Sequence, residues 1–132
     1  MDKVKIREYI EKTIELYKIY LDCKEKISNE KVVDFPKMFD NYVEITEKCG
    51  DKRKAFWDFL SSLSEEEVIQ IFSIMYAGRD YVLSIPEEPE FVPFEEQYKY
   101  FKGERKEIAI SMMFGKSPLI DYLQAGMKYY SI

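Results

Sequence analysis

LSEEEVIQIFSIMYAGRD, residues Leu63–Asp80, is the stretch that decides the fold. Ser64 is the predicted N-cap of a helix, because Glu67 follows three residues later and each side chain can accept a hydrogen bond from the other's backbone N–H. Only two residues between 68 and 77 are polar, so the helix is apolar nearly all round. We therefore expect a buried central helix that ends at Gly78.

The composition fits one folded domain over residues 1–132. Hydrophobic residues make up 46% of the chain and aromatic residues 16%, far more than a disordered segment carries, and a chain of this length can bury a real core. No run approaches the roughly 18 apolar residues of a membrane span. The charged N-terminus also lacks the apolar core of a signal peptide. We predict a cytoplasmic protein that does not enter a membrane.

The net charge restricts the class of binding partner, and the cysteine content restricts the disulfides that the chain can form. The net charge of −5 and the isoelectric point near 5.0 disfavour a nucleic-acid partner, since binding to phosphates requires a basic face. An acidic chain favours basic partners instead. Cys23 and Cys49 are too few for a disulfide framework. Spacing alone leaves a single bridge open, and reduced thiols are the expectation.

Apolar residues at helical spacing continue through most of the remaining chain. The wide apolar stripe of the first helix fits packing within the domain or contact across a homodimer. Gly50 is a predicted helix stop, and Gly103 weakens a later helix where a kink is expected. Phe72 and Met75 should be among the most buried side chains. We predict an all-α helical bundle with no strand, whose five or six helices lie near residues 3–27, 36–48, 52–62, 65–77, 94–114 and 118–130.

FLSSLSEEEVIQIFSIMYAGRD (Phe59–Asp80) and MMFGKSPLIDYLQAGM (Met112–Met127) together resemble a bacterial family known as domain of unknown function 3775. The first is similar to the family's acidic helix start, apolar run and aromatic-x-Gly-Arg-Gly-Asp ending, and the second to its Gly-x-Pro-x-Leu-x-Asp-Tyr-Leu ending. The chain departs from these patterns on loops: the second glycine before Asp80 is missing, prolines occupy the segment 86–93, and one extra residue precedes Pro118. The resemblance implies an all-helical domain and supplies no activity.

The usual catalytic and metal-binding groups are missing from the sequence. The chain has no histidine, which removes the commonest general base and any Ser-His-Asp arrangement. Two distant cysteines without histidine do not make a zinc site, and five isolated glycines do not make a phosphate-binding loop. Carboxylates such as Glu65 and Glu66 are better explained by stabilisation of a helix start. We expect no catalytic residue, no cofactor and no metal.

The segment Ile85–Glu96, here called the acidic arm, differs from the helices. It holds three of the chain's five prolines and has no helical period before Phe94, which predicts a loop or an extended arm. Its carboxylates alternate with aromatic rings, a pattern that favours docking on a basic, partly apolar protein surface. The competing interpretation is a solvated loop whose phenylalanines pack on the core. The predicted partner-binding residues are Glu87, Glu88, Glu90, Phe91 and Phe94.

A second candidate site is centred on Arg79, whose planar fork suits a carboxylate or phosphate. An internal ion pair between Arg79 and Asp121 is the favoured structural explanation for these residues. The alternative is a site for a small anionic ligand formed by Tyr76, Arg79, Asp80 and Asp121.

Two functions follow from these sites. The first is a non-catalytic interaction or inhibitor protein, similar to an immunity protein or a phage-encoded inhibitor, that binds a basic protein through the acidic arm. The second is a small-ligand binder or enzyme that uses Arg79. A pocket lined by Tyr76, Arg79 and Asp121 would favour the second, and a flat acidic face at residues 87–96 the first.

Overall fold

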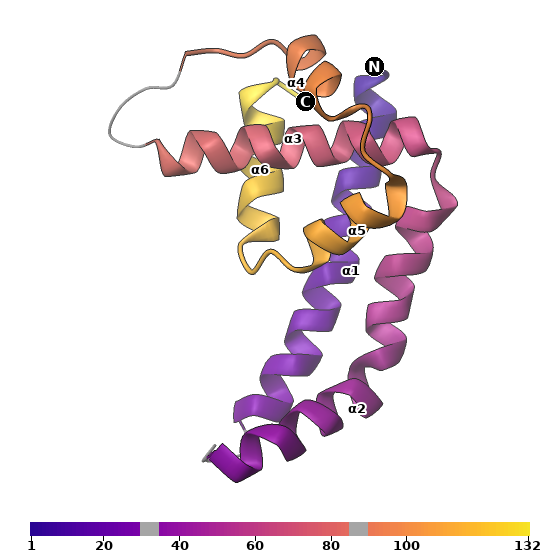
Figure 1. Cartoon of the computed structure of the whole chain (residues 1–132), viewed down its shortest axis with the longest axis vertical. Helices are drawn as coiled ribbons and strands as arrows, with labels where there is room; N and C mark the ends of the chain where they lie inside the picture. The colour runs from indigo at the N-terminus through magenta and orange to yellow at the C-terminus, as the bar shows by residue number, and fades with distance from the viewer. Residues whose placement is uncertain (30–34, 85–89) are drawn as a thin grey trace.

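The computed structural model describes residues 1–29, 35–84 and 90–132, with the backbone alone described at residues 29 and 35–39. Helices make up 83% of the described residues and none of these residues forms a strand, which confirms the predicted all-α fold. Figure 1 shows their arrangement. The six helices are α1 (Lys3–Asn29), α2 (Phe35–Ser62), α3 (Glu65–Leu83), α4 (Phe94–Phe101), α5 (Lys106–Phe114) and α6 (Leu119–Tyr129).

Helix α3 is the central helix, as predicted. Every residue from Val68 to Gly78 is buried, and the side chains of Phe72 and Met75 are almost completely inaccessible. Helices α1, α4, α5 and α6 pack on α3, and α6 makes the most extensive contact with it. This burial explains why the segment is apolar on all sides.

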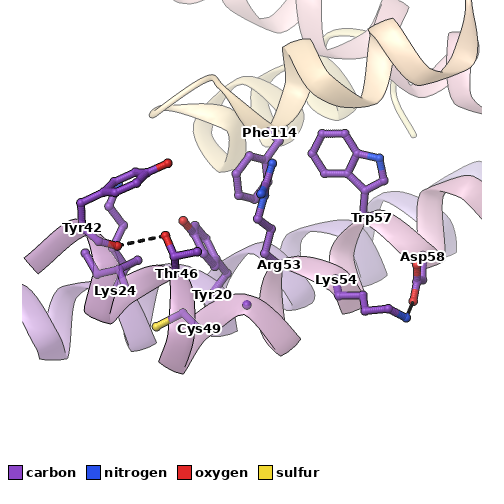
Figure 2. A pocket seen from close by; sticks show the side chains of 12 residues that line it. Tyr20, Lys24, Tyr42, Thr46, Cys49, Arg53, Lys54, Trp57, Asp58 and Phe114 are labelled. Atoms are coloured by element: carbon purple, nitrogen blue, oxygen red, sulfur yellow. Dashed lines mark hydrogen bonds and ion pairs between the residues drawn. The ribbon is translucent and has the colours of Figure 1, made fainter. Parts of the chain in front are cut away.

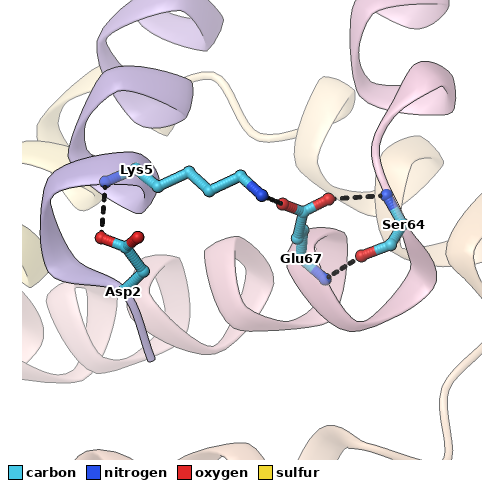
Figure 3. Close-up of polar contacts among 4 residues, drawn as sticks. All are labelled: Asp2, Lys5, Ser64 and Glu67. Atoms are coloured by element: carbon cyan, nitrogen blue, oxygen red, sulfur yellow. Dashed lines mark hydrogen bonds and ion pairs between the residues drawn. The ribbon is translucent and has the colours of Figure 1, made fainter.

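The start of α3 carries the predicted capping box (Figure 3). The Glu67 N–H donates to Ser64 Oγ at 3.1 Å, and the Ser64 N–H donates to Glu67 Oε1 at 2.9 Å. Lys5 of α1 also approaches this carboxylate, with 3.1 Å between its Nζ and Glu67 Oε2. The hydrogen bond from the Ser64 N–H and the nearby Lys5 charge lower the pKa of Glu67 to about 2. One carboxylate thus caps α3 and ties α1 to it.

Gly78 does not end α3, so this prediction is wrong. The glycine lies instead where α3 packs closely against α6. The helix continues to Leu83. A Cβ at Gly78 would lie 1.8 Å from the carbonyl oxygen of Tyr122, and one at Gly126 would lie 2.1 Å from the carbonyl oxygen of Ile74. The two glycines therefore let the backbones of α3 and α6 approach closely where the helices cross (Figure 1).

Two other glycine predictions have different outcomes. Gly50 was predicted to separate two helices, and the structure instead has one continuous α2 through it. A glycine inside a helix costs only about 1 kcal/mol relative to alanine, which the surrounding helical residues can offset. At Gly103 the predicted kink is a complete break between α4 and α5. There Lys106, at the start of α5, donates from Nζ to the carbonyl oxygen of Ser61 in the last turn of α2 and to that of Leu63, just after α2.

Helices α1 and α2 form a long hairpin that extends away from the crossing of α3 and α6 (Figure 1). A disulfide joins Cys23 of α1 to Cys49 of α2, with 6.0 Å between their Cα atoms. The expectation of reduced thiols is therefore wrong. Cys49 lies in the middle of a helix that runs alongside α1, so its side chain can face Cys23, whereas the predicted stop at Gly50 placed it at a helix end.

Candidate functional site

The structure separates the five residues predicted to bind a partner. Glu87 and Glu88 lie outside the described residues. Phe94 is half-buried and its ring packs on Tyr130, with 5.6 Å between ring centroids, so it belongs to the edge of the core. Glu90 and Phe91 are exposed, and 58% of the Phe91 surface is accessible. Only these two described residues of the set are free to meet a partner.

The end of the acidic arm is fixed to the end of α6. The Val92 N–H donates to the Tyr129 hydroxyl at 2.7 Å, and the Tyr130 hydroxyl donates to the Val92 carbonyl at 2.9 Å. Burial raises the pKa of the Tyr130 hydroxyl above its usual value, so it remains a donor at neutral pH. The Phe91 ring stacks on Tyr129 at 5.0 Å. Phe91 is therefore an exposed ring whose position is fixed by stacking on Tyr129 and by the hydrogen bonds of its neighbour Val92.

Further exposed groups surround Phe91. The Tyr81 ring lies 6.0 Å from Tyr129 and is 40% accessible. Asp80, Tyr81, Glu90, Val92 and Tyr129 also line one small hollow of about 40 Å³, hardly larger than a water molecule. We call this group the acidic aromatic surface: Asp80, Tyr81, Glu90, Phe91, Val92 and Tyr129.

Sequence reasoning missed Tyr81 and Tyr129 as members of this surface. Tyr81 follows Ala77 at a helical step, so a helix continuing past Gly78 would have placed it on the same face. Nothing in the sequence distinguished Tyr129 from Tyr130, because the two rings are adjacent and only the fold shows which of them is buried.

The residues around Arg79 are brought together only in part. The Arg79 guanidinium lies 4.5 Å from the centroid of the Tyr76 ring and donates from Nε and Nη2 to Asp80 Oδ1. Within the described ranges, Asp121 forms no ion pair with Arg79 or with any other residue, so the predicted Arg79–Asp121 pair is wrong. Asp121 is exposed in the first turn of α6, where a carboxylate stabilises a helix start. Neither pocket described here is lined by Tyr76, Arg79 and Asp121.

A larger pocket lies between α1 and α2 and contains none of the site residues predicted from sequence (Figure 2). Its volume is about 570 Å³. Helix α2 contributes one face in which Thr46, Gly50, Arg53 and Trp57 follow one another at helical steps. The complete lining comprises Tyr20, Lys24, Tyr42, Ile45, Thr46, Cys49, Gly50, Arg53, Lys54, Trp57, Asp58 and Phe114.

The aromatic walls of this pocket are held by polar contacts. The Tyr17 hydroxyl lies 3.0 Å from the carbonyl oxygen of Phe114 and 3.1 Å from that of Lys116, so it binds the end of α5 to α1. Burial raises the pKa of Tyr17 and keeps this donor protonated. The Arg53 guanidinium lies 5.3 Å from the Trp57 ring and 5.2 Å from the Phe114 ring. The predicted stop at Gly50 had assigned the two halves of this face to different helices, which hid the pattern.

Neither a metal-binding cluster among the described residues nor a match to a known protein assigns a function to these sites. No group of three His, Cys, Asp or Glu side chains that could hold a metal ion occurs in the described part of the chain, and none of the described helices is long and apolar enough to cross a membrane. No family model, no curated protein and no solved structure matches the chain. The resemblance to domain of unknown function 3775 stays a prediction, and the function must be inferred from the residues themselves.

Proposed function

We propose that this protein is a non-catalytic binding protein that docks on a basic protein partner through the acidic aromatic surface. The observation that carries the proposal is Phe91, which is 58% accessible and stacked on Tyr129 by an arm whose backbone is fixed at Val92. A ring held in place before binding loses little conformational freedom when a partner covers it. Aromatic residues, phenylalanine included, are also enriched in protein interfaces relative to the rest of the surface.

The charge around this ring favours a basic partner. Glu90 adds a carboxylate to this surface, Asp80 lies there paired with Arg79 at 3.0 Å, and the whole chain carries a net charge of −5. Such a field speeds the approach of a basic protein and repels acidic ones. An immunity-like or phage-inhibitor-like role is a more specific form of this proposal, in which the basic partner is an enzyme that the protein blocks.

The proposal is tested by capture of partners from native cells with tagged wild-type protein and two variants. Phe91→Ala removes the exposed ring. The matched control is Tyr100→Ala, which removes a ring that is 82% accessible and lies outside the acidic aromatic surface. We expect the same proteins to be recovered with wild type and Tyr100→Ala, to be lost with Phe91→Ala, and to bind more weakly at high salt.

Stability measurements separate docking from folding. Phe91→Ala should lower the free energy of unfolding by about 1–2 kcal/mol, the scale of its two ring contacts with Tyr129 and Tyr130. Glu90→Gln should slow association with little effect on stability, because exposed charges contribute little to folding. Equal recovery with all three proteins, or a large loss of stability in Phe91→Ala, would contradict the proposal.

The location of the protein is also open to test. The sequence predicts a cytoplasmic protein, whereas disulfides persist mainly in oxidising compartments. Native cells are quenched with acid and the thiols of the recovered protein are then titrated, which distinguishes a reducing from an oxidising compartment. Two reactive thiols indicate a reducing compartment, and none indicates that the Cys23–Cys49 bridge is intact where the protein works.

A further inference from the structure

We infer that the pocket between α1 and α2 is a binding site for a planar aromatic anion, in which Arg53 holds the anionic group and the rings of Trp57 and Phe114 cover the aromatic part. The pocket shares no residue with the acidic aromatic surface. The inference thus goes beyond docking of a protein partner and does not depend on it.

The charge of the pocket opposes that of the chain. Three cations, Lys24, Arg53 and Lys54, line it together with a single acid, Asp58. Asp58 is engaged by Lys54 at 2.7 Å. Within the described ranges no carboxylate pairs with Arg53 or Lys24. In a chain with a net charge of −5, two unpaired cations in one pocket point to an anionic ligand.

Arg53 is positioned for such a ligand before it binds. Its guanidinium extends toward the rings of Phe114 and Trp57, as Figure 2 shows, and lies over each ring at just above 5 Å. Stacking on rings leaves the edge of the guanidinium plane available, and that edge carries the N–H groups that bind a carboxylate, sulfonate or phosphate. The Tyr17 hydroxyl of α1 donates to the backbone carbonyl of Phe114 at 3.0 Å and so fixes the end of α5 that carries the Phe114 ring.

The size and lining of the pocket set the class of ligand. A volume of about 570 Å³ falls within the range of pockets that bind small organic molecules. Tyr20, Trp57 and Phe114 offer aromatic faces on which a planar ring can stack. Gly50 leaves the α2 side of the pocket open, since a Cβ there would meet no atom within 4 Å.

The test uses a matched pair of fluorescent probes, anilinonaphthalenesulfonate and its uncharged analogue phenylnaphthylamine. Trp57 is the only tryptophan in the chain and lines the pocket, so its fluorescence reports that a probe has bound, and the variants of Arg53 and Gly50 assign the binding to this pocket. We expect the sulfonate to bind at one site and to quench Trp57. Arg53→Gln should weaken sulfonate binding about tenfold or more, the effect of losing one charge-assisted hydrogen bond, and should change binding of the uncharged probe less than twofold.

Two further variants complete the design. Arg7→Gln removes an exposed arginine elsewhere on α1 and is the control for the change in net charge, so it should leave both affinities unchanged. Gly50→Leu places a side chain in the pocket and should abolish binding of both probes while the helical circular dichroism spectrum is retained. Equal effects of Arg53→Gln and Arg7→Gln on the sulfonate, equal effects of Arg53→Gln on both probes, or quenching that survives Gly50→Leu would each overturn the inference.

Discussion

The crossing of α3 and α6 and the hairpin of α1 and α2 each contain a glycine in the middle of a helix, and the two glycines lie in opposite surroundings. At Gly78 a Cβ would lie 1.8 Å from a backbone oxygen of α6, whereas at Gly50 it would meet no atom within 4 Å. Helix α3 has neighbours on every side. The described far part of α2 lies beside α1 and borders a pocket of about 570 Å³.

The comparison shows two ways of holding helices together in one small protein. Close packing supplies the stability of the crossing, since every buried apolar side chain of α3 belongs to the hydrophobic core. Two helices by themselves cannot bury all their apolar surface, and in the hairpin the Cys23–Cys49 bridge holds the pair together. The hairpin can therefore keep open space for a ligand, which the crossing cannot.

The largest expected effect is that of Gly78→Ala. The new Cβ would overlap the Tyr122 carbonyl, which belongs to the backbone and cannot rotate away, so α3 and α6 must separate. We expect the free energy of unfolding to fall by more than about 3 kcal/mol, at the upper end for overpacked cores. Urea denaturation measures it. A loss below about 1 kcal/mol, within the range of ordinary surface changes, would show that the crossing is not closely packed.

The next effect is that of the disulfide. The bridge spans a sequence separation of 26 residues. A cross-link that closes a loop of this length lowers the entropy of the unfolded chain and so stabilises the folded state by about 3 kcal/mol. Wild-type protein under reducing conditions and the double variant Cys23→Ser with Cys49→Ser should both lose about this much in urea denaturation. Unchanged stability after reduction would mean that packing alone holds the hairpin.

Glu67→Gln should cost about 1 kcal/mol at pH 7, the typical contribution of a helix cap. The pKa of Glu67 is lowered from 4.5 to about 2 in the folded protein, so the unfolded chain takes up the proton first. The stabilisation by this carboxylate is complete above about pH 4.5 and is lost as the pH falls toward 2. Urea denaturation from pH 7 to pH 2.5 should thus show the wild type approaching Glu67→Gln in stability.

Glu66→Gln is the matched control for this prediction, because Glu66 lies in the same first turn of α3 and makes no capping bond. It should change stability by a few tenths of a kcal/mol, as for an exposed charge near a helix start. A gap between wild type and Glu67→Gln that is constant with pH would exclude the carboxylate charge as the cause.

The smallest effect has the opposite sign. Gly50→Ala should raise the free energy of unfolding by about 0.4–1 kcal/mol, because alanine restricts the unfolded chain and fits the helix without strain. Thermal denaturation of both variants and the wild type measures it: the melting temperature should rise in Gly50→Ala and fall in Gly78→Ala. A loss of stability in Gly50→Ala would show that the space beside Gly50 is filled.

Local sequence patterns predicted those features of the fold that depend on neighbouring residues. The capping box of Ser64 and Glu67 and the burial of Phe72 were both predicted, since each follows from a few consecutive residues. Gly50 and Gly78 were misassigned as helix ends. A glycine can end a helix, allow two helices to approach closely or border a pocket, and which of these it does depends on the element that packs against it in the tertiary structure.

The candidate sites show the same limit. Phe91 was a predicted partner-binding residue with packing on the core as the competing interpretation, and its exposure and its support by Tyr129 both required the position of α6. Pairing of Arg79 with Asp80 instead of Asp121 depended on α3 continuing past Gly78. The pocket at Arg53 required both the continuity of α2 and the packing of Phe114 from α5, neither of which a local pattern supplies.

Residue-resolved hydrogen exchange of the oxidised and the reduced protein tests most directly whether packing holds the crossing and the disulfide holds the hairpin. Reduction should speed exchange of amides in residues 20–28 and 42–52, and should leave amides in residues 68–78 of α3 protected until global unfolding exposes them. Equal acceleration in α3 and in the hairpin, or none in the hairpin, would contradict this account.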